Sequence, residues 1–320
     1  MDQKTKNKIE IVRYNPEWPK MFEFEASRIR EALGHNCLAV HHVGSTSIPH
    51  LVAKDRLDII AVVTNPADAI AALETLGFTY KGEYNIPFHY GFSKRGARNI
   101  NLQVYQEGHA EIEVNLTFRD YLRTYGAVRD NYARLKLQLV KSETAAEKNN
   151  DSLFSEYTLK KGAFIHEVLK KAELSCLRVL KCNGPLEWET AKLFRQEYFE
   201  ALGQEDTGAD TFNQENHQHF VLCYGVDIFG YAHVELLADA KAALRIFMVD
   251  DIKKNQSFAG KFLTVLEKWL KAQNYKVLSV QASVQAVPFY EKNRYFADSV
   301  EGDLEKKSNP SGVLMEKVLF

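Results

Sequence analysis

Residues 245–280 have the sequence RIFMVDDIKKNQSFAGKFLTVLEKWLKAQNYKVLSV, and this stretch decides the fold of the second half of the chain. β-Branched and aromatic residues in ALRIFMV (243–249) predict a central strand, and YKVLSVQA (275–282) predicts the next one. Between them, apolar residues recur at helical spacing and predict a helix with one buried face. These residues are Phe258, Phe262, Leu263, Leu266, Trp269 and Leu270.

The predicted helix begins with small and polar residues, KNQSFAG (254–260). A helix that starts directly after a strand presents several unpaired N–H groups and the positive end of its dipole. Small side chains there let an anion approach the backbone. The same residues are also compatible with an ordinary helix start that Asn255 or Ser257 caps. On this stretch alone, both interpretations stay open.

One strand further on, FYEK (289–292) is followed by an aromatic residue. With this order of elements, Leu177 to Phe320 resembles the GNAT superfamily of acyl-CoA-dependent N-acetyltransferases. The family's pyrophosphate loop, R/Q-x-x-G-x-G/A, corresponds to KNQSFA (254–259). The resemblance implies that the strand end near Val249 pairs with the pantetheine arm of acetyl-CoA. It also implies that the following backbone amides hold the pyrophosphate: Lys254, Asn255, Gln256, Ser257, Phe258, Ala259 and Gly260.

The resemblance further implies a catalytic role for Tyr290, which aligns with a tyrosine that protonates the departing CoA thiolate. A phenol suits this role because it is protonated at pH 7, although a packing aromatic is the alternative. His233 and Glu235 alternate on one face of the predicted strand AHVEL (232–236), so either could accept the amine proton. The alternative is a solvated strand face. Arg245 is expected to be a structural ion-pair partner.

Two positions depart from the GNAT pattern. Ser257 replaces the first loop glycine, and Arg294 replaces the glycine of FYEKxGF. Glycine is required only where φ is positive, so Ser257 is tolerable if its φ is negative. Either the binding mode persists with a modified backbone, or activity has been lost.

The first half contains HHVGSTSIPHLVAKDRLDIIAVV (41–63), a Gly-Ser turn followed by a strand that carries Asp58. Together with YNPEWPKMFEFE (14–25), FRDYLR (118–123) and YTLKKGAFI (157–165), this makes residues 9–172 resemble the GrpB family, which is related to the nucleotidyltransferase superfamily. In that superfamily a Gly-Ser turn can hold a phosphate, and paired carboxylates can hold Mg²⁺.

This copy lacks the paired carboxylates. Ile60 follows Asp58 at the second position, and Asn101-Leu102-Gln103 replaces the family's HLH. One carboxylate seldom makes a Mg²⁺ site, so no metal is expected. The remaining candidates form an anion site, for which solvated helix faces are the alternative: Gly44, Ser45, Asp58, Arg119 and Lys161, with Arg123 beside them. The domain is therefore interpreted as a binding or regulatory module.

The composition limits the partners. The chain has 320 residues, with 41 Lys+Arg against 42 Asp+Glu, and this balance predicts no binding to nucleic acid or to a membrane. The beginning of the sequence lacks a secretory signal and no apolar run could span a bilayer, so a cytoplasmic location is expected. Cys37, Cys176, Cys182 and Cys223 form no CxxC pair, which favours reduced thiols. The sequence does not indicate an oligomeric state.

Helical and strand patterns alternate throughout, which predicts an α/β protein with mixed sheets. We expect a nucleotidyltransferase-like domain in residues 1–173 and a GNAT acyl-CoA N-acyltransferase fold in residues 174–320. The predicted function is transfer of an acetyl group from acetyl-CoA to the amine of an acceptor that the sequence does not identify. The alternatives are a non-catalytic acyl-CoA- or nucleotide-binding protein and a nucleotidyltransferase that acts through the first domain.

Overall fold

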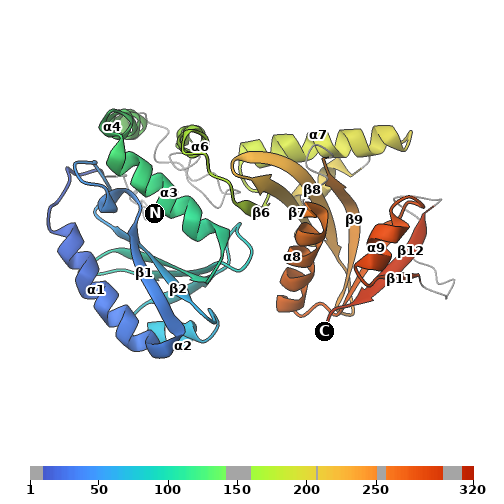
Figure 1. Cartoon of the computed structure of the whole chain (residues 1–320), viewed down its shortest axis with the longest axis horizontal. Coiled ribbons are helices and arrows are strands. Elements are labelled where there is room, and N and C mark those ends of the chain that lie inside the picture. The colour runs from blue at the N-terminus through green and yellow to red at the C-terminus, as the bar shows by residue number, and fades with distance from the viewer. Residues whose placement is uncertain (1–9, 142–159, 207, 251–256, 298–311) are drawn as a thin grey trace, which may run out of the picture. The chain divides into compact units, whose positions relative to one another are not determined.

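The computed structural model describes residues 10–141, 160–206, 208–250, 257–297 and 312–320. The chain divides into two compact units, Met1–Arg178 and Val179–Phe320. Figure 1 shows that each unit is built around its own sheet with helices packed against it. Each sheet contains both parallel and antiparallel neighbours, so the expected α/β fold class with mixed sheets is confirmed. None of the described helices is long and apolar enough to cross a membrane.

The first unit contains a five-stranded sheet in the order β1-β2-β5-β4-β3. β2 and β5 are parallel, and the other neighbouring pairs are antiparallel. β2 is the apolar run LDIIAVV, which is buried on both faces as expected for a central strand. The strands are β1 (Cys37–Val43), β2 (Leu57–Val63), β3 (Thr79–Gly82), β4 (Tyr90–Lys94) and β5 (Ile100–Gln106).

Helices cover both faces of this sheet (Figure 1). α1 and α2 pack on one face through residues such as Trp18 and Leu73, and α3 packs on the other through Ile112 and Leu116. A further apolar cluster joins α3, α4 and α6. The helices are α1 (Trp18–Leu33), α2 (Ala69–Thr75), α3 (Ala110–Thr124), α4 (Gly126–Lys141) and α6 (Gly162–Lys171).

The second unit contains a seven-stranded sheet in the order β11-β12-β10-β9-β8-β7-β6. Its strands are β6 (Leu177–Lys181), β7 (His217–Tyr224), β8 (Asp227–Leu236), β9 (Lys241–Val249), β10 (Val277–Ala282), β11 (Phe296–Ala297) and β12 (Val313–Val318). The helices are α7 (Pro185–Ala201), α8 (Phe258–Ala272) and α9 (Val287–Lys292).

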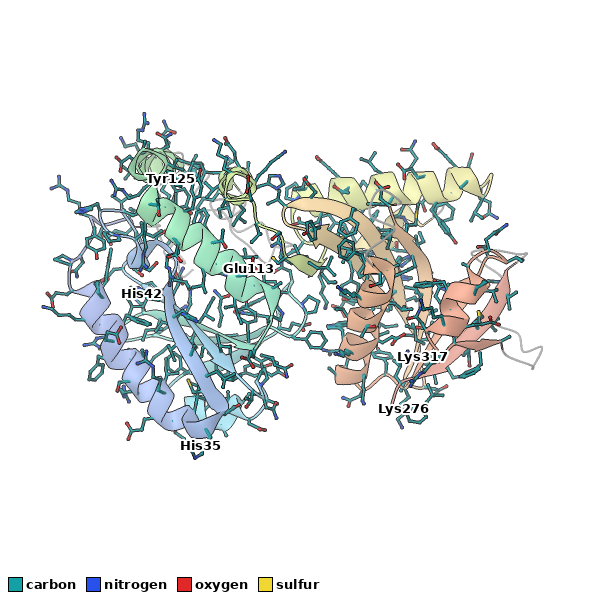
Figure 2. All side chains as sticks on the ribbon, in the orientation of Figure 1. His35, His42, Glu113, Tyr125, Lys276 and Lys317 are labelled. Atoms are coloured by element: carbon teal, nitrogen blue, oxygen red, sulfur yellow. The ribbon has the colours of Figure 1, made fainter. Side chains whose placement is uncertain are left out.

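α7 and α8 pack on opposite faces of this sheet. Phe194 of α7 stacks on Tyr231 of β8, whereas Trp269 of α8 contacts Phe220 of β7. Tyr231 pairs with Val221, the neighbour of Phe220, and neighbouring strand residues point to opposite faces. At the far edge, Lys317 of β12, labelled in Figure 2, donates a 2.6 Å hydrogen bond to Glu267 of α8.

The two parallel strands at the centre of the second sheet pair over only part of their length. β9 and β10 pair from Lys241–Val277 to Leu244–Val280. β9 then continues to Val249 and stays paired with β8 on its other side. After Leu244, the side of β9 that faces β10 is therefore no longer paired with β10.

Candidate functional site

A cavity of about 990 Å³ lies in the second unit beside this open edge of β9. Three elements form it: the end of β9, the start of α8, and α9 with the turn before it. The lining residues include six that the sequence predicted, namely Val249, Ser257, Phe258, Ala259, Gly260 and Tyr290. The other three, Lys254, Asn255 and Gln256, lie outside the described residues. Segments 40 residues apart in the sequence thus meet around one hollow.

The start of α8 faces this cavity with its backbone donors. The first bond of the helix runs from the N–H of Lys261 to the carbonyl of Ser257, at 3.2 Å. The N–H groups of Phe258, Ala259 and Gly260 therefore have no partner inside the helix. Ser257 makes no side-chain capping bond, and the first turn of this described helix contains no acidic residue. The helix end is thus suited to an anion.

Side chains around the helix start also favour an anion. Lys261 and Lys292 both line the cavity and are exposed, against one described carboxylate, Asp250. Gly260 leaves space on the cavity side, because an added Cβ would meet only Asn293 Oδ1, at 3.8 Å. Two cations and a small residue thus lie beside N–H groups that have no partner inside the helix, which makes this part of the cavity wall positive.

Ser257 and Arg294 both adopt a backbone conformation that favours glycine. Their φ angles are 51° and 65°, both in the left-handed region. Ser257 therefore does not have the negative φ under which serine would be tolerated without strain. A non-glycine residue pays about 1–2 kcal/mol for this conformation because its Cβ approaches the carbonyl oxygen. Both residues therefore hold a backbone conformation that costs stability.

Arg294→Gly should therefore stabilise the second unit by about 0.5–1 kcal/mol, because glycine adopts a positive φ without steric cost. Arg294 is exposed, so the change removes little packing. Urea unfolding of both proteins would measure the difference. Lys268→Gly, at an exposed position inside α8, is the matched control and should destabilise by about 1 kcal/mol. Equal destabilisation by both changes would contradict strain at Arg294.

Tyr290 lines the cavity and is buried, with 4% of its surface exposed. Its ring packs edge-on against Phe289 and Tyr295, with centroids 5.1 and 5.3 Å away. Burial raises the pKa of the Tyr290 hydroxyl well above its usual value, and the Tyr198 phenol adds to this. The hydroxyl is therefore protonated at neutral pH and can donate a proton or a hydrogen bond.

Glu235 and Arg245 form an ion pair, with Arg245 Nε 2.6 Å from Glu235 Oε2. The prediction that Arg245 is an ion-pair partner is confirmed. Arg245 is the extra residue of a β-bulge, since His233 pairs with Ile246 and Val234 pairs with Leu244. The bulge places Arg245 beside Glu235. Neither residue lines the 990 Å³ cavity.

His233 has both ring nitrogens engaged. Nδ1 lies 3.2 Å from Nη1 of Arg195, and Nε2 lies 2.8 Å from Nδ1 of His217. A guanidinium only donates, so Nδ1 of His233 accepts and Nε2 carries the proton that it donates to His217. Burial, followed by His219 and Arg195, holds the pKa of His233 far below its usual value. In this arrangement His233 has no lone pair left for an amine proton, which disfavours the expected role as a base.

Arg195 organises this buried cluster. It is 2% exposed and donates to both carboxylate oxygens of Asp206, at 2.8 and 2.5 Å. The sequence pattern gave no sign of Arg195 or of His217, because an arginine in an amphipathic helix normally faces solvent. Here the α7 face that carries Arg195 packs on the sheet beside Tyr231.

In the first unit, the Gly44-Ser45 turn lies against Asp58. Gly44 has φ 66°, and an added Cβ would lie 2.5 Å from Asp58 Oδ2, so only glycine fits. Asn101 Nδ2 donates to Asp58 Oδ1 at 2.9 Å. Ile60, at the position of a second carboxylate, is fully buried among apolar residues. Among the described residues, no group of three or more His, Cys, Asp or Glu side chains could hold a metal ion.

The structure separates the predicted anion-binding residues into two groups. Arg119 donates to the carbonyl of His42 at 3.0 Å and to both carboxylate oxygens of Asp120. Arg123 donates to the carbonyl of Ser47. These contacts hold the arginines on the backbone around His42, which Figure 2 labels.

The second group surrounds Asp58. Ser45 Oγ accepts a 3.0 Å hydrogen bond from Nζ of Lys136, a residue that the sequence analysis did not identify. Lys161 interacts electrostatically with Lys136 and with Asp58. Four of the predicted residues therefore lie in this second group, namely Gly44, Ser45, Asp58 and Lys161. Lys136 joins them, and Arg119 belongs to the other group.

Lys136 should make the stability of the first unit depend on pH. Burial, followed by Lys161, lowers its pKa to about 7, whereas an unfolded lysine titrates near about 10.4. The unfolded chain binds more protons between these values, so this contribution to stability rises as the pH rises from 7 to 10. The free energy of unfolding of the native protein, relative to that of Lys136→Met, should increase by up to about 1.4 kcal/mol per pH unit. Urea unfolding of both proteins at pH 7 and 9 would measure it, and pH-independent differences would contradict the shifted pKa.

Two family models match the chain. Residues 8–171 match the model described as GrpB protein, and residues 189–310 match the Acetyltransferase (GNAT) domain. UPF0157 protein BH1888 of Halalkalibacterium halodurans is 40% identical over 167 residues, which cover 51% of this chain and 82% of that protein.

Two solved structures are similar to separate parts of the chain. The conserved protein GrpB from Enterococcus faecalis is 33% identical, with a TM-score of 0.44, and the match covers 51% of this chain and 96% of that one. A GNAT-family acetyltransferase from Staphylococcus aureus is 18% identical, with a TM-score of 0.37, over 45% of this chain and 100% of that one.

Proposed function

The chain belongs to the GrpB family and carries a GNAT acetyltransferase domain, and from this we propose that the second unit transfers an acetyl group from acetyl-CoA to an amine. The observation that carries the proposal is the 990 Å³ cavity. Its wall combines N–H groups that have no partner inside their helix, a strand edge beyond the ladder with β10 and a buried tyrosine. We propose that the first unit is a binding or regulatory module.

The two ends of the cavity suit the two ends of acetyl-CoA. The diphosphate would accept hydrogen bonds from the N–H groups of Phe258, Ala259 and Gly260, with Lys261 and Lys292 providing positive charge. The pantetheine arm carries amides that can bond to the edge of β9 between Arg245 and Val249, where the ladder with β10 has ended. Phe247 and Phe289, whose rings stack with centroids 6.0 Å apart, would cover the arm with apolar surface.

The transfer step needs one attack and two proton movements. The amine nitrogen attacks the thioester carbon, the C–S bond breaks, and the thiolate leaves. Tyr290 gives its phenolic proton to the thiolate sulfur and regains one from solvent. Neither Glu235 nor His233 lines the cavity, and His233 has no free lone pair, so we assign the removal of the amine proton to water.

A thiol-release assay tests this function. Acetyl-CoA is incubated with the full chain and a set of primary amines: a polyamine, a free amino acid, a lysine peptide and an N-terminal peptide. We expect thiol release that depends on one class of amine and on the enzyme concentration. Release that is equal with and without every amine, from a protein that binds acetyl-CoA, would overturn the acetyltransferase proposal.

A second candidate is an acyl-CoA-binding protein without catalysis. Ser257 and Arg294 stand at two positions where the acetyltransferase pattern has glycine, and this departure from the pattern favours it. It predicts acetyl-CoA binding with no turnover for any amine. Nucleotidyl transfer by the first unit is not proposed, since Ile60 occupies the position of the second carboxylate.

A further inference from the structure

Positive side chains surround Asp58 in the first unit, outside the site proposed for acetyl-CoA. Asp58 acts electrostatically on Lys54, Lys136, Lys161 and Arg95, and Arg56 acts on three of these. The Asp58 cation cluster is defined here as these five cations: Lys54, Arg56, Arg95, Lys136 and Lys161. They come from four separate parts of the chain, so the fold and not local sequence brings them together.

Hydrogen bonds fix the centre of the Asp58 cation cluster. Asn101 donates to Asp58 Oδ1 at 2.9 Å and accepts from Arg95 Nη2 at 2.7 Å. Lys136 is 2% exposed and is held by Ser45 Oγ and by the carbonyl of Val52. The polar groups at the centre are thus pre-arranged by the protein and do not depend on flexible surface chains.

One of these cations, Arg56, has a buried hydrogen-bond donor that none of the described residues accepts from. Nε of Arg56 is inaccessible to solvent and has no hydrogen-bond partner in the part of the chain that the structure describes. A buried charged donor without a partner is costly, so a ligand or an ion that accepts a hydrogen bond from it would stabilise the folded protein. Asp58, Lys54 and Arg56 are only partly buried, so a ligand can reach them from solvent.

The charge balance indicates the sign of that ligand. Asp58 acts on Lys54, Lys136 and Lys161, whose pKa values are nevertheless all lowered, first by burial and then by neighbouring cations. Like charges brought together in a partly buried site repel one another. A multiply charged anion would relieve this repulsion, and a divalent cation would increase it.

We propose that the first unit binds a phosphate-bearing anion directly on the Asp58 cation cluster, without a bridging metal ion. Arg56 and Arg95 can donate to phosphate oxygens with forked geometry, and Lys54 and Lys161 add point charges. Asp58 holds Asn101 and the lysines in position. The site is independent of the acetyl-CoA cavity and remains if the second unit has another function.

Calorimetry with inorganic diphosphate tests the site. The full chain carries Ser257→Asp, which blocks anion binding at α8, and the buffer contains EDTA. We expect one site per chain, an affinity at least tenfold weaker in Arg56→Met and in Lys54→Met, and unchanged affinity in Lys20→Met. Lys20 is an exposed lysine of the same unit, paired with Glu17. Both test residues are only partly buried, so their variants should fold, which the unfolding temperature would check.

The proposal would be overturned by the absence of heat with diphosphate, by equal affinity in Arg56→Met and Lys20→Met, or by binding that requires Mg²⁺. Inorganic triphosphate and ATP distinguish the two sources of phosphate. Tighter binding of ATP identifies a nucleotide as the ligand, and tighter binding of triphosphate identifies a free polyphosphate. The absence of binding by either also overturns the proposal.

Discussion

Tyr290→Phe should lower kcat for acetyl transfer by about 10²–10⁴-fold, the usual contribution of a positioned general acid. The change removes one hydroxyl and keeps the ring packed against Phe289 and Tyr295. Affinity for acetyl-CoA should therefore change little. Because burial raises the pKa of this hydroxyl, native Tyr290 is protonated across the working pH range when acetyl-CoA binds.

The control for this variant is Tyr295→Phe. Tyr295 is also buried, but its hydroxyl donates to Glu267 at 3.0 Å and lines no part of the cavity. Its loss should lower the unfolding temperature and leave kcat unchanged. Steady-state kinetics with a saturating amine, together with the unfolding temperature, would separate the two effects. Equal kcat in native protein and Tyr290→Phe would remove Tyr290 from the mechanism.

Ser257→Asp should weaken acetyl-CoA binding by about one to three powers of ten. A carboxylate beside a diphosphate repels it by about 1–4 kcal/mol per charge pair, and it can occupy the N–H groups that the ligand needs. Folding should not suffer, because an acidic residue at a helix start is favourable by about 0.3–1 kcal/mol and Asp tolerates a positive φ.

Two further variants at this position separate charge from backbone. Ser257→Asn has the shape of Asp without the charge and should bind acetyl-CoA within a few-fold of the native protein. Ser257→Gly should bind at least as well and unfold at a higher temperature, because φ 51° costs glycine nothing. Weak binding by Ser257→Asn would show that side-chain bulk, and not charge, blocks the site.

The sequence predicted the elements that are buried or strongly periodic. β2 has the bounds of the apolar run LDIIAVV, and α8 carries its six predicted apolar residues, all buried. Asn274, shortly after the end of this helix, has φ 67°, a left-handed conformation that asparagine adopts readily. A strand that is apolar on both faces and a helix with one apolar stripe can each bury their apolar residues in essentially one way, so pattern and structure agree.

Short, half-exposed strands gave no such pattern. β3 contains only TYKG, with every residue at least partly exposed, and β12 mixes apolar and charged residues. Their pairing comes from neighbouring strands, β4 for β3 and β10 for β12, which the local sequence does not encode. Tertiary contacts decide such strands more than propensity does.

The site residues divide in the same way. Ser257, Phe258, Ala259, Gly260 and Tyr290 follow a local motif, and all of them line one cavity. Lys136 and Ser45 are 91 positions apart and meet only through packing of α4, so no local pattern could indicate their contact. Arg195 and His233, 38 positions apart, are the corresponding case in the second unit.

Calorimetric titration of acetyl-CoA into the full chain tests the central claim, that the cavity beside the start of α8 binds an acyl-CoA. We expect saturable binding at this cavity, together with a rise in the unfolding temperature, because a ligand that binds only the folded protein stabilises it. This binding should survive in Lys54→Met and fall at least tenfold in Ser257→Asp. No heat and no change in unfolding temperature at millimolar acetyl-CoA, or full binding by Ser257→Asp, would contradict it.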